Sequence, residues 1–328
     1  MDLSLIIPLW NDAIGVRRIL AQAQDFGVFS EIIICDDASD EALQLESWEE
    51  LSPAFRNRIV YLRNDVRMGA GHARNMGLSQ VTCSHLIFFD ADDLFEDDFL
   101  RIIADIDSHE LGPIADFCIF RHNDTRLLDR GETGSFSKEE KLWEAVGASE
   151  ELQQLTEKQA AILCGLAAYP WNKIYRTAFL RQHSIRCTEL PVHNDIELHW
   201  SSFISAEVIL CCSILGARHY VAEDGLRLTN NRSEDRLRVF EAFSAICARI
   251  SHADSNKKIN FVEPLMVFAR NLISWIKENI EDEHKEELVS RSQRFFLENL
   301  DSNRMTLIAY QNPALAHRIN NLLIQGRV

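Results

Sequence analysis

The sequence has little of what would set a chain apart from ordinary folded proteins. Its 328 residues include only 13 Gly and 7 Pro, which excludes a collagen-like or low-complexity chain. The eight cysteines show no C-x-x-C spacing, and we expect reduced, buried thiols in a cytosolic protein. The longest apolar run, 208–217, falls well short of the ~20 residues that span a bilayer. The apolar start at 3–9 lacks the basic residues and length of a secretory signal.

Positive charge is also scarce. The chain carries 34 Lys and Arg against 50 Asp and Glu, a formal net charge of −16. A negative field of this size repels polyphosphate backbones, and no local basic stripe offsets it, so nucleic acid is not an expected partner. We therefore expect any phosphorylated ligand to bind together with a cation.

What the sequence does contain is a succession of short apolar runs with room for helices between them. This alternation predicts an α/β fold with a parallel, doubly wound sheet. The segment 121–141 is polar, contains two glycines and is expected to be a loop. The expected strands are 3–8, 31–35, 59–62, 85–89 and 116–120, and the expected helices are 13–23 and 71–78.

The pattern changes in the second half of the chain. From Leu142 it indicates helices with one extended segment, and from Asp235 it indicates helices alone. In 261–280 the apolar residues fall at three- and four-residue steps with Pro264 near the start, which predicts a core or subunit-packing helix. The expected regions are therefore 1–115, 116–234 and 235–328.

Polar and acidic residues follow three of the expected strands. They are Pro8 to Asp12, Asp36 to Asp40, and Asp90 to Asp93. In open parallel sheets, ligands bind at the carboxyl ends of the strands, so these residues are the first candidates for a site. Carboxylates crowded at one edge repel each other unless a divalent cation or hydrogen-bond donors offset the charge. Each cluster by itself also fits helix capping or a turn.

The third strand leads into a glycine-rich segment, Gly69 to Gly77. It nearly matches the G-x-G-x-x-G dinucleotide fingerprint, but Arg74 occupies the place of the third glycine and the segment follows the wrong strand. We expect the glycines to turn the backbone into a helix whose N-terminus, with Arg74, faces a phosphate or the acidic cluster. The alternative is that Arg74 pairs with a carboxylate and orders it.

Taken together and in this order, these motifs resemble family 2 glycosyltransferases of the GT-A fold. The resemblance covers residues 3 to 233 and includes Asn194-Asp195, where family members usually carry Glu-Asp. It implies a GT-A doubly wound, mostly parallel sheet flanked by helices, with a helical C-terminal region. It also implies inverting transfer of a sugar from a nucleoside diphosphate sugar to an acceptor hydroxyl. The segments that carry it are Leu5–Pro8, Ile32–Asp40, Gly69–Gly77, Phe89–Asp93 and Trp171–Arg176.

The resemblance divides the donor-binding residues by task. Side chains after the first two strands would hold the base and ribose, Asp90 would meet the ribose, and Asp92 would bind Mn²⁺ or Mg²⁺, which bridges the phosphates. Oxygen ligands suit such hard cations. The nucleotide-sugar-binding set is Pro8, Trp10, Asn11, Asp36, Asp37, Arg74, Asp90, Ala91 and Asp92.

On the acceptor side, the resemblance implies that Asp195 takes the proton of the attacking hydroxyl. No nucleophile is evident, which favours a single displacement. Asn194 removes one negative charge beside this base, while His193 and Glu197 are expected to tune its proton affinity. The alternative for Asp195 is a helix cap. Four further residues are expected near the acceptor or diphosphate: Trp171, Lys173, Arg227 and Arg232.

Other functions stay open at this point. A GT-A domain can bind a nucleotide sugar or glycan without turnover, and Asp90-x-Asp92 superficially matches an aspartate-nucleophile phosphatase, although Leu94 replaces its Thr. The expected partners are a UDP-sugar donor and a glycan, lipid-linked or other hydroxyl acceptor in polysaccharide biosynthesis. A homodimer through the C-terminal helices and a peripheral position at the inner face of the cytoplasmic membrane are further expectations.

Overall fold

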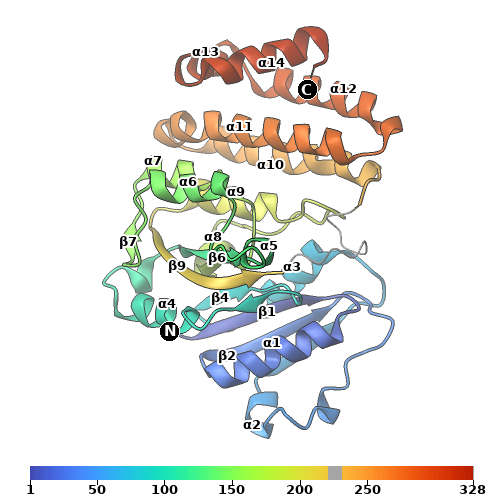
Figure 1. Cartoon of the computed structure of the whole chain (residues 1–328), viewed down its shortest axis with the longest axis vertical. Helices are drawn as coiled ribbons and strands as arrows, with labels where there is room; N and C mark the ends of the chain where they lie inside the picture. Colours follow the sequence, from blue (N-terminus) through green and yellow to red (C-terminus); the bar gives the residue numbers. More distant parts are fainter. Residues whose placement is uncertain (221–230, 328) are drawn as a thin grey trace.

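One mixed sheet organises the first two thirds of the chain (Figure 1). The structure is a computed structural model that describes residues 1–220 and 231–327. Within these residues the sheet has nine strands in the order β3-β2-β1-β4-β8-β6-β9-β5, with β7 paired to β9. The strands are β1 (Leu3–Leu9), β2 (Phe29–Asp36), β3 (Ile59–Arg63), β4 (His85–Phe88), β5 (Leu94–Phe95), β6 (Phe117–Asp124), β7 (Gln153–Gln154), β8 (Lys173–Arg176) and β9 (Ile209–His219).

The N-terminal half of the sheet is parallel, as predicted. Strands β3, β2, β1 and β4 run parallel, whereas β8 joins β4 and β6 antiparallel and β5 and β7 join β9 antiparallel. The β6–β9 pair is parallel again. The predicted α/β class is confirmed: the sheet is mixed, and its longer ladders are the parallel ones. The carboxyl ends of β1, β2 and β4 meet at one edge, which places the predicted site there.

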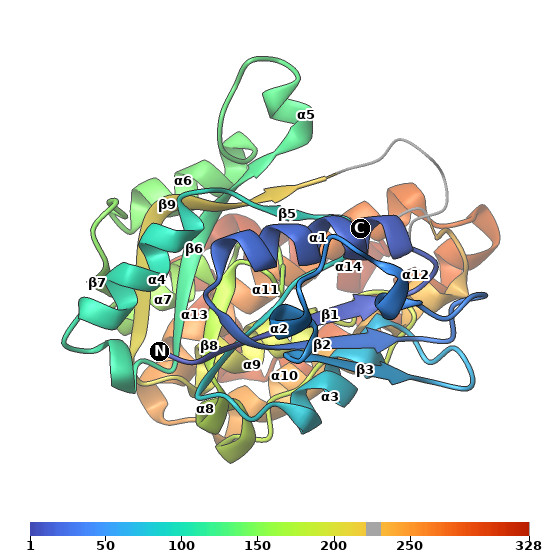
Figure 2. The ribbon, with the colours of Figure 1, turned by 90° about the horizontal axis from the view of Figure 1, so that it is seen from below.

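The sheet separates two hydrophobic cores because side chains alternate between its faces. On β1, Leu5 and Ile7 pack with helices α1 (Ala13–Phe26) and α4 (Phe99–Ser108), while Ile6 faces the opposite core. Figures 1 and 2 show α1 on one side of the sheet and the C-terminal helices stacked beyond the other. The helices of the first part are α1 (Ala13–Phe26), α2 (Pro53–Arg56), α3 (Ala70–Gln80), α4 (Phe99–Ser108), α5 (Thr125–Leu128), α6 (Ser137–Ala145), α7 (Glu157–Leu163), α8 (Thr177–Gln182) and α9 (Ile196–Ser205).

The predicted loop 121–141 was wrong at both ends. Strand β6 continues to Asp124, since Arg121 to Asp124 pair with β9, and α6 begins at Ser137. The prediction of one extended segment after Leu142 was also wrong, because β7, β8 and β9 all lie there. Polar residues form a strand at β6 because a neighbouring strand supplies hydrogen-bond partners, which local sequence does not reveal.

The helical prediction after Asp235 is confirmed for the residues described. Helix α11 begins six residues before the predicted 261, so Pro264 lies in its interior and not near its start. Its residues Phe261, Leu265 and Ile276 are buried, as expected of a core helix. The C-terminal elements are η4 (Glu234–Arg238), α10 (Val239–His252), α11 (Ser255–Asn279), η5 (Asp282–His284), α12 (Lys285–Asn299), α13 (Ser302–Gln311) and α14 (Pro313–Gln325).

The C-terminal helices share a core with the sheet. One continuous cluster of buried apolar residues runs from Ile6 on β1 through Phe203 on α9 to Leu322 on α14. All eight cysteines lie in the described part and are buried free thiols, as predicted. Of the helices described, none combines the length and apolar character that crossing a bilayer requires.

A substitution at Gly77 on α3 can test how closely this helix packs on the sheet. A Cβ at this position would lie 2.5 Å from Ile6 Cγ2 and 2.9 Å from Cys35 Sγ. We therefore expect Gly77→Ala to lower the free energy of unfolding by about 1–3 kcal/mol through overpacking. In an exposed helix the same change would stabilise by up to about 1 kcal/mol. Urea denaturation measures the difference, with Ser79→Ala, exposed on the same helix, as a near-neutral control. A gain of stability for Gly77→Ala would contradict the packing.

Candidate active site

The loops after β1 and β2 are joined to each other at the carboxyl edge of the sheet. The Asn11 backbone N–H donates to Ser39 Oγ at 2.9 Å, and the Asp40 backbone N–H donates to Asn11 Oδ1 at 2.8 Å. Asn11 adopts a positive φ of 54°, a conformation in which Asn is enriched. Beside it, the exposed ring of Trp10 lies 3.4 Å from the guanidinium carbon of Arg67. Trp10 and Asn11 thus lie at the surface of a loop that is held by hydrogen bonds. The family resemblance implies that the nucleotide base binds there.

Asp36 points into the protein and not toward that surface. Its carboxylate is 0% exposed and accepts hydrogen bonds from Tyr61 Oη, Arg63 Nη1 and the Ser39 backbone N–H. Burial alone would raise the pKa of Asp36, but these hydrogen bonds lower it below its usual value. Direct contact between Asp36 and a nucleotide, which the sequence predicted, is therefore not supported.

Asp37 organises the glycine-rich segment. Its carboxylate accepts from Asn64 Nδ2 at 2.9 Å and from the backbone N–H groups of Met68 and Gly69 at 2.8 and 2.6 Å. Gly69 precedes α3 with φ 95°, a region that favours glycine. Asp37 is nearly fully buried. It therefore sets where α3 begins, and its predicted contact with the base is no better supported than that of Asp36.

Arg74 on α3 connects two parts of the predicted site. It is 5% exposed, and its guanidinium donates to Asp90 Oδ1 at 2.5 Å and to Asn194 Oδ1 at 2.7 Å. Burial acts to lower the pKa of Arg74, but the neighbouring Asp90 and other acidic groups raise it above its usual value. The alternative, that Arg74 pairs with a carboxylate, describes the observed contact with Asp90, whereas the expected contact of Arg74 with a phosphate stays a prediction. Through Arg74, the acidic turn after β4 is held beside the loop that carries Asp195.

The acidic turn itself is fixed by its backbone and by Asp93. Arg18 on α1 donates to the Asp92 carbonyl at 2.9 Å. The turn packs so closely on α1 that a Cβ on Gly15 would lie 2.3 Å from the Ala91 carbonyl oxygen. Asp90 keeps 27% of its side chain exposed, whereas Asp93 turns inward. The turn is therefore held by α1 and by Asp93, and the side chains of Asp90 and Asp92 are both half-buried.

Asp93 ties this turn to the end of β9. Its Oδ1 lies 3.0 Å from His219 Nδ1 and accepts the Tyr220 backbone N–H at 2.8 Å, while Oδ2 is buried without a hydrogen-bond partner. Burial raises the pKa of Asp93, and although burial acts to lower the pKa of His219, its contact with Asp93 raises it. The His219 ring stacks on Trp171 with centroids 5.4 Å apart. His219 is not among the predicted site residues, because a single His carries no local sequence signal of its partner.

Asp195 stands at the start of α9 without capping it. Its side chain forms no hydrogen bond to the first turn, so the capping alternative is wrong. Burial raises the pKa of Asp195 to about 6, although the nearby Arg74 acts to lower it. Glu197, the expected tuning residue, is instead hydrogen-bonded to Thr188 at 2.8 Å. His193 is neutral because burial lowers its pKa to about 3. With a pKa of about 6, the carboxylate of Asp195 is largely ionised at pH 7 and is still able to accept a proton.

The four residues predicted on the acceptor or diphosphate side are distributed differently from the prediction. Trp171 and Lys173 are buried, and the Lys173 ammonium donates to the Tyr169 carbonyl and Asn172 Oδ1 at 2.6 and 2.7 Å. Burial lowers the pKa of Lys173 to about 7. Direct contact of these two side chains with a substrate is not supported, since neither reaches the surface. Arg232 is exposed, and Arg227 lies outside the described residues.

The chemistry of the acidic turn fits a divalent cation that keeps part of its shell for other ligands. Asp90 and Asp92 offer carboxylate oxygens, and Mg²⁺ or Mn²⁺ commonly takes only one or two carboxylates alongside substrate phosphates and water. Over the described ranges 1–220 and 231–327, three metal-ligating side chains come within 4.8 Å of one another at Glu281, Glu283 and His284 alone. That group is a surface cluster at the start of α12 and gives no indication of catalysis.

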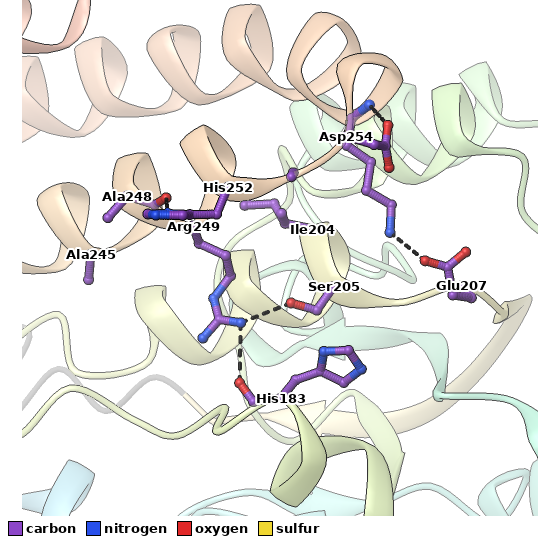
Figure 3. A pocket seen from close by; sticks show the side chains of 11 residues that line it. His183, Ile204, Ser205, Glu207, Ala245, Ala248, Arg249, His252 and Asp254 are labelled. Carbon is purple, nitrogen blue, oxygen red and sulfur yellow. Dashed lines mark hydrogen bonds and ion pairs between the residues drawn. The ribbon is translucent and has the colours of Figure 1, made fainter.

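A separate cavity of about 560 Å³ lies away from the strand ends, between α8 and α9 on one side and α10 and α11 on the other (Figure 3). In it Arg249 donates to Ser205 Oγ at 3.0 Å, and Lys257 donates to Glu207 Oε1 at 2.9 Å. These basic groups are engaged with the protein itself. The candidate active site is therefore the edge where Asp90, Arg74 and Asp195 meet.

Comparison with known proteins bears on what this edge does. The sequence profile described as Glycosyl transferase family 2 matches residues 4–170. An uncharacterized glycosyltransferase of Haemophilus influenzae is 31% identical over 94 residues, which cover 28% of this chain and 30% of that protein. Escherichia coli WfaP, a UDP-Glc:alpha-D-GlcNAc-diphosphoundecaprenol beta-1,3-glucosyltransferase, is 35% identical over 63 residues, 19% of this chain and 24% of that protein. The chain thus matches less than a third of the length of these relatives.

Solved structures are similar over nearly the whole chain. S. aureus TarS 1–349 in complex with UDP-GlcNAc superposes with a TM-score of 0.73 at 19% identity, covering 99% of this chain and 88% of TarS 1–349. The mannosyltransferase PcManGT from Pyrobaculum calidifontis, in complex with GDP-Man and Mn²⁺, gives a TM-score of 0.52 at 12% identity and the same coverage. At these identities the likeness establishes the GT-A fold and nothing more specific. The 99% coverage of this chain includes its C-terminal helices.

The buried Arg74 can be tested as a structural link. Removing it leaves Asp90 without its cation, so we expect Arg74→Met to lower the free energy of unfolding by about 3 kcal/mol. The exposed pair of Arg101 and Glu150, with side chains 47% and 67% exposed, is the control, and Arg101→Met is expected to cost under about 1 kcal/mol. Chemical denaturation measures both. Equal losses in the two variants would contradict the link.

Proposed function

Because this chain belongs to glycosyl transferase family 2, we propose that it is a glycosyltransferase that transfers a sugar from a UDP-sugar to an acceptor hydroxyl by a single, inverting displacement. The observation that carries the proposal is the contact between Arg74, Asp90 and Asn194, which brings the donor-side turn and Asp195 together. Without that contact, the two acids would be unrelated surface groups.

The donor would lie across the carboxyl ends of β1, β2 and β4. Trp10 offers an exposed ring to the base, and Asn11, whose backbone N–H donates to Ser39 and whose amide is hydrogen-bonded to Asp40, fixes the loop that carries this ring. A UDP-sugar is the preferred donor because TarS was solved with UDP-GlcNAc and WfaP is named for UDP-Glc. Asp36 and Asp37 serve by shaping the loops, since their carboxylates are already hydrogen-bonded.

Asp92, with Asp90 beside it, would hold Mn²⁺ or Mg²⁺. A divalent cation stabilises the charge that grows on the departing nucleoside diphosphate. The chain's own contribution is a rigid turn: Arg18 holds the Asp92 carbonyl, and His219 holds Asp93. In a chain of net charge −16, a cation is the simplest way to retain a diphosphate.

Asp195 would accept the proton of the acceptor hydroxyl as that oxygen attacks the anomeric carbon. The bond from the anomeric carbon to the diphosphate oxygen breaks as the new bond forms on the opposite face, which inverts the configuration. Arg74 keeps the carboxylate of Asp195 ionised above pH 6 by lowering a pKa that burial raises. Asn194, which stands where family members usually carry Glu, accepts a hydrogen bond from Arg74. The proton transfer is therefore assigned to Asp195 alone.

The competing functions are weaker. Family membership excludes the phosphatase, and Leu94, which replaces the Thr of its motif, is part of strand β5. Family membership also favours turnover over a binding module, and turnover of a donor distinguishes the two. We place the reaction in glycan or polysaccharide biosynthesis, with a lipid-linked acceptor as in the name of WfaP, at the inner membrane face. Association through the C-terminal helices stays a prediction.

The general base gives a pH dependence. Since Asp195 must be ionised to accept a proton, kcat/KM is expected to fall as pH is lowered through about 6 and to level off above it. Asp195→Asn is expected to bind UDP normally and to lose transfer by at least about a hundredfold. The measurement is turnover of radiolabelled UDP- and GDP-sugars with Mn²⁺. Glu197→Gln, whose carboxylate is held by Thr188, is the control and should keep the acid limb. If Asp195→Asn stays active and its kcat/KM still falls as pH is lowered through about 6, the assignment is wrong.

The cation assignment is tested by binding. Asp92→Asn is expected to weaken Mn²⁺-dependent UDP binding at least about tenfold, because the cation loses a charged ligand. Titration calorimetry with UDP, with and without Mn²⁺, measures this. Asp97→Asn changes an exposed acid a few residues along and should leave binding as it is. If Asp92→Asn and Asp195→Asn lose UDP binding equally, the division between donor and acceptor residues is wrong.

A further inference from the structure

Helix α11 of the C-terminal region reaches the loop that carries the general base. The Trp275 ring on α11 lies edge-on to His193, with centroids 6.4 Å apart and planes at 82°. His193 is two residues before Asp195 and next to Asn194, which Arg74 holds. The C-terminal end of α11 is on the side of the molecule where β1 and β2 end (Figure 1). An aromatic side chain 80 residues further along the chain thus adjoins the acceptor side of the site.

The Trp275 ring is held in place although much of it is exposed. The guanidinium carbon of Arg236, a buried residue of η4, lies 4.5 Å from the ring centroid, within range of a cation–π contact. The Arg236 guanidinium also donates to the Asn231 carbonyl and lies 3.5 Å from His193 Nε2. His193 itself has φ 61°, a conformation that needs support from its surroundings. Arg236 therefore fixes the ring and the base loop relative to each other.

The exposed part of this ring needs an explanation. Trp275 is 40% exposed, although burying a ring of this size is strongly favourable. Its neighbours on α11, Ile273 and Ile276, are fully buried, so the helix had apolar positions available for the core. A rigid, partly exposed aromatic ring beside polar groups is typical of small-molecule sites, where the ring covers an apolar ligand face and polar groups orient the ligand.

We propose that Trp275, fixed by Arg236, is an acceptor-binding residue that stacks on the sugar ring whose hydroxyl Asp195 deprotonates. The C–H face of a sugar ring is apolar and its rim carries hydroxyl groups, so the face packs on the indole while a rim hydroxyl reaches the carboxylate. This inference rests on the proposed function. It assigns the acceptor to the sugars and makes the C-terminal helices part of the active site.

The experiment measures transfer from the donor that the wild type uses to a panel of p-nitrophenyl glycosides of glucose, galactose, mannose and N-acetylglucosamine. Trp275→Ala is expected to raise the KM of the best glycoside at least about tenfold while the Kd of UDP with Mn²⁺ changes by less than about twofold. Trp275→Phe keeps a ring and should recover most of the affinity. Tyr310→Ala removes an aromatic ring that is 88% exposed on α13 and is the matched control.

Three results would overturn the proposal: an unchanged glycoside KM in Trp275→Ala, an equal loss of UDP affinity, or a Trp275→Phe variant as impaired as Trp275→Ala. A wild type that hydrolyses a donor but uses none of the glycosides would overturn the sugar acceptor. Thermal unfolding of each variant identifies a loss caused by misfolding, which Trp275→Phe avoids. A wild type that turns over no donor at all would instead contradict the proposed function itself, so the two failures are distinguishable.

Discussion

The buried guanidinium of Arg74 is the interaction on which the arrangement of the site depends. It joins α3, the acidic turn after β4 and the loop before α9, three segments that meet only in the folded chain. A buried cation is costly unless it is paired and hydrogen-bonded, and here Asp90 and Asn194 supply both. The same charge lies close enough to Asp195 to keep its raised pKa near 6. One side chain thus contributes to both the geometry of the candidate site and the pKa of Asp195.

The acidic residues at the sheet edge divide according to where they point. Asp36, Asp37 and Asp93 turn inward, and their hydrogen bonds hold the loops after β2, before α3 and after β4. Asp90 and Asp195 stay partly exposed beside Arg74. Crowded like charges are tolerated because the inward carboxylates receive donors from the protein. In the proposed function, the partly exposed carboxylates take the roles of cation ligand and proton acceptor.

The C-terminal helices belong to the same folded unit as the sheet. Their apolar side chains continue the core that begins on one face of β1, and α11 also contacts the loop before Asp195 through Trp275. A helical region that supports the base loop is in a position to determine acceptor choice. The donor side, built from the parallel strands, needs no contribution from it.

The sequence by itself determined the parallel half of the sheet and the helical character after Asp235, and it named Asp90, Arg74 and Asp195 as candidate site residues, because apolar periodicity and strand-end motifs are local signals. Only the tertiary structure decided that Asp36 and Trp171 are buried, that β6 extends to Asp124, and that Trp275 adjoins His193. The direction of a side chain and the partner of a strand depend on residues distant in sequence, and those contacts form only when the chain packs.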